Sequence, residues 1–564
     1  MAQGWQITAT GINFMEPPPA GTGNIAVVQR GQGGNGGTDV FALGAWGEAT
    51  GYPSEVEFFG DRLWLGGTPA DPQVLWASCT GDYTNFGKSA PMVDSDAITI
   101  GINSRQVNVI KELVPLDSLL VLTTGGEYRV GGGSDDVITP SSVSIKNQGN
   151  SGTGDVEAQV IGESALFLQA EGQKVRDLRY QFEKDGFRGN DVGVWADHLF
   201  TGRLITGIDY WKAPWQVVWY MRSDGVRLGC TYMPEQEVSG WHWHDTDGLY
   251  LDSCSLPGTM ESECYFLTER STPQGVVRCI EAQAPTFFDD EDDMFFVDCG
   301  LTYDGRNRSA TTVTITSESG DWSDQAEVVV VASAGIFDPA TGDAGDGLEL
   351  WTDVPNEDGG TDRVTVRLLI DTVAGFAHAV CRPVVEVPEG LRGRPVTTWS
   401  MQRDTIGGLW HLEGRDVAVL ADSGSVGPYR VTGGRIVMEK PAAVVHVGLP
   451  YVAELETLEL NAQGAEPLRE QMKLAHKVSI LVHGTRGVEF SEGAASSWYP
   501  VADRDAEPYG TPPFLKTGVI DVNIPTIWNE DAGRVRIRSK EPLPMEVLAI
   551  TVRAIASPGQ AAGR

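Results

Sequence analysis

Positive charge is scarce in this sequence. Its 42 Lys and Arg residues stand against 77 Asp and Glu residues, and the formal net charge is −35 at pH 7. Because such a chain repels phosphate at long range, the composition argues against a protein that grips nucleic acid through a basic patch. Duplex DNA as passing cargo stays compatible with it, since a conduit works better when the polyanion does not stick to its wall. Taken alone, the charge is explained as well by the solubility of an abundant protein.

Cysteine is too sparse and too widely spaced for a metal or disulfide framework. The seven cysteines are Cys79, Cys230, Cys254, Cys264, Cys279, Cys299 and Cys381. Their number is odd and no Cys-x-x-Cys occurs, which argues against both zinc ribbons and disulfide scaffolds. We therefore expect reduced thiols, as in a protein made in a cytoplasm.

Long hydrophobic runs are missing as well. The longest aliphatic run, Val328–Ala332, is far shorter than the roughly 20 residues that a membrane helix needs. The first residues, MAQGWQITATGINF, lack the basic and apolar regions of a secretory signal. We expect a soluble protein without membrane insertion.

Helical periodicity is nearly absent, and a strand hairpin recurs in its place. Each copy has a short apolar strand, a turn that contains Gly and a second alternating strand. The copies occupy residues 62–79, 119–130, 165–175, 217–232 and 264–280. An interval of about 50 residues is typical of the four-stranded blades of a β-propeller. A string of unrelated β-sandwich hairpins is the alternative.

Two later segments, 417–431 and 478–488, resemble these hairpins, whereas the stretch 301–400 breaks the rhythm. We predict a mainly β protein with a β-propeller-like core of repeated strand hairpins and an inserted small β-domain. The predicted regions are an N-terminal, partly irregular arm (1–45), a first section of the β-propeller (46–300), the inserted β-domain (301–400), and a second section of the β-propeller with a C-terminal β region (401–564). The acidic run 289–293 is interpreted as a solvated boundary loop.

Two motifs come closest to a metal site. His242 and His244 would share one face of a strand, but no third ligand follows at zinc spacing, so an aromatic-rich strand is the plainer interpretation. Asp338, Asp343 and Asp346 loosely resemble a calcium loop without the alternating Asp spacing and terminal Glu of an EF-hand. A turn-rich loop is favoured there.

Motifs for hydrolysis or nucleotide binding are missing. No Gly-x-Ser-x-Gly elbow occurs, and the segment 81–89 has one residue too many for a phosphate-binding loop, with no helix pattern after it. The segment 422–426 is typical of a turn. Carboxylates are so numerous that a glycosidase-like pair would have no evidential value. We predict no catalytic, cofactor-binding or metal-binding residues and no enzymatic activity.

A series of short segments, taken in order, resembles the nozzle family of podophage tails, also called tail tubular protein B or tail stabilisation protein. The longest is GYPSEVEFFGDRLWLGGT at 51–68. The others lie at 72–78, 81–86, 94–97, 123–128, 175–180, 191–198, 223–225, 231–238, 241–244, 247–248, 412–422, 448–451, 517–518 and 542–550. The resemblance is collinear over about 46–300 and 401–553.

This resemblance implies a structural virion protein that forms a homohexameric nozzle in a short bacteriophage tail. Its neighbours would be an adaptor ring, similar to tail tubular protein A, beneath the portal, tail fibres or spikes, and a tail tip or plug protein. Duplex DNA would pass through as transient cargo without specific binding, and the ring would act as conduit and closure for DNA ejection. The protein would be located in the virion tail after assembly in the host cytoplasm.

Two alternatives from other classes stay open. A tail-associated, carbohydrate-acting β-propeller enzyme would show activity on polysaccharide, or a concave pocket with perturbed carboxylates. A receptor-binding tail protein would be a trimer with a long fibrous stem, although no stem-like repeat is visible.

Overall fold

Strands dominate the computed structural model of the chain. It describes residues 25–27, 41–43, 45–132, 137–339, 343–356, 360–460, 472–492, 497–504, 507, 511–523 and 534–556. Within these residues the helices are short 3-10 turns: η1 (Phe182–Lys184), η2 (Val194–Leu199), η3 (Pro234–Gln236), η4 (Glu291–Asp293), η5 (Glu389–Leu391) and η6 (Trp410–Leu412). The predicted mainly β fold is therefore confirmed.

The chain divides into two compact units. Unit 1 comprises Met1–Ser271 and Val276–Gln283, and unit 2 comprises Thr272–Gly275 and Ala284–Arg564. In unit 1, β1 (Ile25–Val27) pairs with β2 (Phe41–Leu43) in a two-stranded sheet. Most of the predicted N-terminal arm, 1–45, lies outside the described residues.

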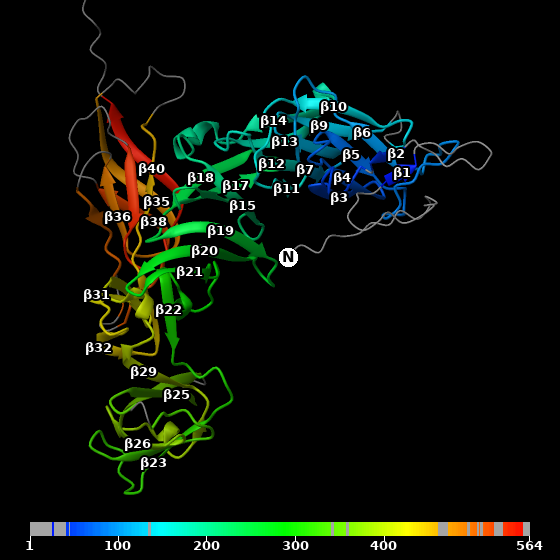
Figure 1. Cartoon of the computed structure of the whole chain (residues 1–564). Coiled ribbons are helices and arrows are strands. Elements are labelled where there is room, and N and C mark those ends of the chain that lie inside the picture. Colours follow the sequence, from blue (N-terminus) through cyan, green and yellow to red (C-terminus); the bar gives the residue numbers. More distant parts are fainter. Residues whose placement is uncertain are drawn as a thin grey trace, which may run out of the picture. The chain divides into compact units, whose positions relative to one another are not determined.

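The rest of unit 1 is a series of antiparallel meanders, each a separate sheet (Figure 1). Sheet 1 contains β3 (Glu55–Phe59), β4 (Arg62–Gly66), β5 (Val74–Ala77) and β6 (Ile98–Gly101). Sheet 2 contains β7 (Ile110–Pro115), β8 (Leu119–Thr123), β9 (Gly126–Gly131) and β10 (Ser144–Gly149). Sheet 3 contains β11 (Gln159–Ile161), β12 (Ser164–Leu168), β13 (Val175–Gln181) and β14 (Gly186–Asp191).

Sheets 4 and 5 continue the series. Sheet 4 contains β15 (Ile205–Trp211), β16 (Val217–Arg222), β17 (Arg227–Met233) and β18 (Val238–His244). Sheet 5 contains β19 (Leu249–Leu256), β20 (Glu263–Thr272) and β21 (Gly275–Ala282). The five hairpins predicted at intervals of about 50 residues are thus the second and third strands of five successive blade-like sheets.

Successive sheets stack face to face, which explains the continuous apolar runs in their second strands. On β8, Leu119 and Val121 pack toward sheet 1, whereas Leu120 and Leu122 pack toward sheet 3. Side chains alternate between the two faces of a strand, so a strand that is covered on both faces must be apolar at every position. The same alternation on β16 sends Tyr220 toward sheet 3 and Trp219 toward sheet 5.

Unit 2 is built from three other assemblies of sheets. A four-stranded sheet has the order β22 (Asp298–Asp304), β33 (Val444–Leu449), β30 (Asp416–Ala421) and β31 (Gly424–Arg430). A larger sheet has the order β28 (Pro395–Val396), β23 (Val313–Thr316), β24 (Val328–Ala332), β27 (His378–Pro383), β26 (Thr361–Gly375), β25 (Gly347–Pro355), β29 (Trp399–Ile406) and β32 (Ile436–Ala442). The core of the larger sheet runs from Val313 to Met401, which is almost entirely within the stretch 301–400. The domain boundaries at 300 and 400 stay predictions.

The third assembly in unit 2 is a sandwich of two C-terminal sheets. One sheet contains β34 (Ala453–Glu456), β39 (Val535–Ser539), β36 (Val488–Glu492) and β37 (Tyr499–Pro500), and the other contains β38 (Lys516–Asn523), β35 (Lys473–Thr485) and β40 (Glu546–Ala556). They share one hydrophobic core. The hairpin predicted at 478–488 was wrong, because β35 and β36 belong to opposite sheets. The hairpin at 417–431 is present as β30 and β31.

Candidate functional site

The two histidines predicted as the nearest approach to a metal site bind each other. They lie on one face of β18, where Nδ1 of His242 is 2.8 Å from Nε2 of His244. Burial lowers the pKa of His242 to about 4 and also lowers the pKa of His244, which favours the neutral form of both imidazoles at pH 7. Among the described residues, no group of three His, Cys, Asp or Glu side chains is arranged to hold a metal ion.

A guanidinium between sheets 4 and 5 accounts for part of this shift. Arg227 lies 4.6 Å from the ring centre of Trp219, 4.8 Å from that of Tyr250 and 4.1 Å from that of Phe266. Its positive charge, second to burial, lowers the pKa of His242 further. The aromatic rings attract the cation through their negative faces, so the arrangement stabilises the packing of the two sheets.

The His242 ring packs directly on Gly229, which has no side chain. A Cβ at this position would lie 2.0 Å from Cε1 of the His242 ring. We expect Gly229→Ala to lower the free energy of unfolding by about 1–3 kcal/mol, because the ring must leave its place between strands. Chemical denaturation measures the loss, and Gly240→Ala is the matched control, since nothing lies within 4 Å of its Cβ. Equal stability of the two variants would contradict this packing.

The calcium-like loop is closed by an arginine. Arg403 donates from Nη2 to Asp343 at 2.8 Å and from Nε to Asp346 at 3.0 Å. Asp343 also accepts from the backbone N–H of Asp338 at 2.7 Å. Residues 340–342 lie outside the described residues of the chain. The Arg403 guanidinium thus lies between these carboxylates, where a calcium ion would have to bind.

The segment 81–89 is anchored to sheet 1 and leads into no helix. Ser89 donates from its backbone N–H and its hydroxyl to the carboxylate of Asp96, at 2.9 and 2.8 Å. Arg62, 2% exposed, donates to the carbonyls of Ser78, Asp94 and Asp96 at 2.6–2.8 Å. A carboxylate therefore occupies the position from which a phosphate would have to accept hydrogen bonds.

Within the segment 422–426, Asp422 and Ser423 form the turn between β30 and β31, and residues 424–426 begin β31. Asp422 and Ser423 have φ values of 45° and 61°, which side chains other than Gly adopt mainly in turns. The Asp422 carboxylate accepts from the N–H groups of Ala443 and Val444, both at 2.9 Å. Hydrogen bonds from the start of β33 therefore hold this turn.

The acidic run 289–293 is exposed at Asp289, Asp290 and Asp293, in agreement with the predicted solvated loop, and ion pairs hold it in addition. Arg306, whose side chain is 16% exposed, donates to three carboxylates. These are Asp290 at 3.0 Å, Asp304 at 2.9 Å and Asp293. Arg308, which is 64% exposed, pairs with Asp293 and Asp304 at 3.2 and 3.0 Å. We call this group of two arginines and their carboxylates the acidic clamp.

The run also contacts three distant segments of unit 2. Ser423 donates its hydroxyl to Asp292 Oδ1 at 2.5 Å, and His446 Nε2 lies 2.8 Å from the Asp292 carbonyl oxygen. Arg486, whose side chain is 2% exposed, lies 3.8 Å from Glu291 and donates to the Ser423 carbonyl. The acidic run therefore contacts the β30–β31 turn, β33 and the C-terminal sandwich. Sequence patterns missed these contacts because the partners are more than a hundred residues away in the chain.

Two glutamates in unit 1 have strongly raised pKa values. Glu55 on β3 and Glu112 on β7 both reach about 7, chiefly because burial disfavours the charged form and, in addition, because of the neighbouring Glu157. Both carboxylate oxygens of Glu112 accept from the N–H of Ala158, at 2.9 and 2.8 Å. Lys111 pairs with Asp155 beside them.

These values predict a loss of stability between about pH 4.5 and 7. Because the folded-state pKa is above the unfolded value, the protonated form favours folding, and this advantage is lost as the pH rises through 7. We expect Glu112→Gln to reduce the difference in unfolding free energy between pH 5 and 8 by on the order of 1–3 kcal/mol. Denaturation at the two pH values measures it, and exposed Glu163→Gln serves as the control. An unchanged pH dependence would contradict the assignment.

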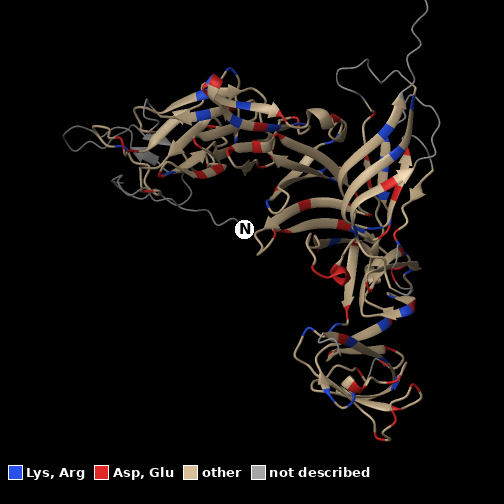
Figure 2. Cartoon of the chain, turned by 180° about the vertical axis from the view of Figure 1, so that it is seen from behind, with Lys and Arg blue, Asp and Glu red and all other residues tan. Residues whose placement is uncertain are grey.

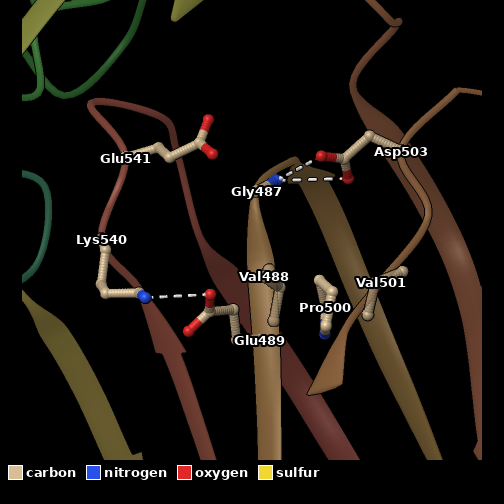
Figure 3. A pocket seen from close by; sticks show the side chains of 8 residues that line it. All are labelled: Gly487, Val488, Glu489, Pro500, Val501, Asp503, Lys540 and Glu541. Carbon is tan, nitrogen blue, oxygen red and sulfur yellow. Dashed lines mark hydrogen bonds and ion pairs between the residues drawn. The ribbon is translucent and has the colours of Figure 1, made fainter. Parts of the chain in front are cut away.

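A shallow cavity of about 240 Å³ lies in the C-terminal sandwich (Figure 3). Three of its four charged lining groups have partners in the wall: Lys540 pairs with Glu489 at 3.0 Å, and Asp503 accepts from the backbone N–H of Gly487 at 3.2 Å. Val488 and Val501 complete the wall. Because most of its charged groups are already paired within the wall, the cavity presents no evident chemistry.

Comparisons with known proteins assign no family. No protein-family model and no curated protein matches the chain. Among solved structures, a luciferin-regenerating enzyme is similar over 39% of this chain and 85% of its own, at 8% identity and a TM-score of 0.17. A likeness at this level assigns neither activity nor ligand. None of the helices in the described residues is long and apolar enough to span a membrane.

Proposed function

We propose that the chain is a structural subunit of a homohexameric nozzle in a short bacteriophage tail. The support from the sequence is the collinear series of segments that resembles this family. The ring would lie beneath the adaptor ring and portal, next to fibres or spikes and a tip or plug protein. It would guide DNA during ejection and close the channel before it.

The observation that carries the proposal is an exposed apolar patch on sheet 1. Val56 and Phe58 lie on the face of β3 turned away from sheet 2 and are 62% and 59% exposed. Tyr83, 43% exposed, packs edge to face on Phe58 at 5.1 Å, and Tyr52, 61% exposed, precedes the strand. All four belong to the segments 51–68 and 81–86 that carry the resemblance. Exposed apolar patches of this kind mark contact surfaces between proteins.

The charge of the chain suits a DNA conduit. Asp and Glu residues are scattered over many strands and loops of both units (Figure 2). At physiological salt the Debye length is about 8 Å, so repulsion between ring and DNA acts only at close approach and prevents adhesion. Strong, salt-sensitive binding of duplex DNA by the isolated ring would contradict this role.

Native mass measurement tests the assembly. We expect a hexamer from the unmodified chain and a shift to smaller species in the double variant Val56→Asp, Phe58→Asp, because two charges would have to be buried at the contact. Ser141→Asp, which adds a charge at an exposed turn, is the control. A folded chain that stays monomeric at high concentration, or that cleaves polysaccharide, would overturn the proposal. Electron microscopy of the tail then locates the ring.

A further inference from the structure

The stack of sheets in unit 1 has two end faces, the face of sheet 1 turned away from sheet 2 and the face of sheet 5 turned away from sheet 4. Among the described residues, the hydrophobic core between sheets 1 and 2 does not extend to Val56 and Phe58. The core between sheets 4 and 5 likewise does not extend to Val276 and Ile280. Sheets 2, 3 and 4, in contrast, pack on a neighbouring sheet on both sides.

The end face of sheet 1 has the composition of a covered face. Strand pairing places Val56 opposite Leu65 and Phe58 opposite Leu63, so these four apolar side chains share one face. Val56 and Phe58 are nevertheless 62% and 59% exposed. Because Trp64 is buried on the other face, β4 is apolar on both faces from Leu63 to Leu65. In this chain that pattern is typical of strands that lie between two sheets.

Alternation along β20 and β21 identifies the end face of sheet 5. On β20, Phe266 belongs to the core with sheet 4, so Glu269, three positions later, points to the opposite face. Arg278 of β21 lies 3.2 Å from Glu269 and therefore shares this face. Val276 and Ile280, two positions before and after Arg278, point the same way.

This face of sheet 5 is apolar, and its ion pair leaves little net charge there. Val276 and Ile280 are 66% and 78% exposed. The positive charge of Arg278 is offset by that of Glu269, with which it pairs. Exposed apolar surface whose charges are already paired is suited to burial against another apolar surface.

A ring of identical subunits needs two different contact surfaces on each chain. In a cyclic ring of more than two copies every contact is heterologous, so the surface around Val56 and Phe58 must meet a different surface of the next copy. A contact between two sheet 1 faces would be isologous and would stop at a dimer.

We propose that the end face of sheet 5 in one copy packs on the end face of sheet 1 in the next copy. This contact would repeat between chains the face-to-face packing that joins successive sheets of unit 1 within one chain. The inference rests on the proposed hexameric nozzle and identifies the two surfaces that join its subunits.

Native mass measurement of a sheet 5 variant is the first test. We expect Val276→Asp, Ile280→Asp to weaken assembly at least about tenfold, because two charges would have to be buried at the contact. Both residues are mostly exposed in the single chain, so the circular dichroism spectrum should stay unchanged. Val238→Asp adds a charge at an apolar position of sheet 4 that is 39% exposed. This control should assemble as the unmodified chain does.

Mixing two variants shows whether the contact joins different faces. The sheet 5 variant keeps an intact sheet 1 face, and Val56→Asp, Phe58→Asp keeps an intact sheet 5 face. We expect each variant alone to be mainly monomeric and the mixture to form a dimer with one copy of each. This dimer cannot grow, because both of its outer faces carry the new charges.

The outcomes separate this inference from the proposed nozzle. A sheet 5 variant that still forms hexamers would overturn the inference and leave the nozzle proposal standing, since another surface would then meet sheet 1. A mixture without the dimer would overturn the inference as well, because the two faces would not be partners. An unmodified chain that stays monomeric would overturn both.

Discussion

Arg62→Ala is expected to lower the free energy of unfolding by about 3–5 kcal/mol. Arg62 donates to the carbonyls of Ser78 and Asp96, both at 2.6 Å, and to that of Asp94 at 2.8 Å. The side chain is 2% exposed, so its removal leaves acceptors without donors in a place that water reaches poorly. Each buried unsatisfied group costs about 1–3 kcal/mol.

Chemical denaturation measures this loss, and two variants make it specific. Arg203→Ala removes a guanidinium that is 43% exposed and pairs with Asp224, so it should cost at most about 1 kcal/mol. Arg62→Lys keeps the positive charge, but an ammonium lacks the planar set of donors with which a guanidinium reaches three carbonyls. This variant should therefore recover only some of the stability. An Arg62→Ala variant as stable as Arg203→Ala would show that the carbonyls find other donors.

Arg306→Ala is expected to have the second largest effect, about 2–4 kcal/mol, because it leaves the carboxylates of the acidic clamp close together without their shared cation. Burial alone would raise the pKa of Asp304, but hydrogen bonds from Arg306 and Arg308 hold it at about 2. A lowered folded-state pKa contributes stability above the unfolded value of 3.8 and loses it as the pH falls toward 2. The variant should therefore lose less stability than the parent between pH 5 and 2.5.

Arg308→Ala is the matched control for the clamp. It contacts Asp293 and Asp304 as Arg306 does, but its side chain is 64% exposed and screened by solvent. We expect it to cost less than about 1 kcal/mol. If both variants lost the same small amount of stability, the clamp would have no stabilising role.

The repeat of the hairpins could be predicted from the sequence because its cause is local. A strand buried on both faces must be apolar at every position, and a tight turn needs a residue that tolerates positive φ, such as Gly225 (φ 82°) at the β16–β17 turn. Both requirements produce a recognisable pattern, an apolar run followed by a turn residue, within about ten residues. The spacing of this pattern predicted the five blade-like sheets of unit 1.

The hairpin predicted at 478–488 was wrong because its local sequence pattern does not identify the pairing partners of the two strands. Gly484 and Gly487 lie between two apolar strands, as in a hairpin, but β35 continues to Thr485 and pairs with β38 and β40. β36 pairs with β39 in the facing sheet. Strands that connect the two sheets of a sandwich have the same local pattern as a hairpin, and only the partners distinguish them.

By itself the sequence determined the class of fold and the strands of unit 1, since alternation, turn residues and apolar runs act on neighbours in the chain. Tertiary structure alone decided which charges meet. Arg62, Arg227 and Arg306 each look like ordinary cations on a strand or loop, yet three carbonyls, three aromatic rings and three carboxylates respectively surround them. Burial and electrostatic pairing depend on distance in space, and segments more than a hundred residues apart, such as Asp292 and His446, come together only when the sheets have packed.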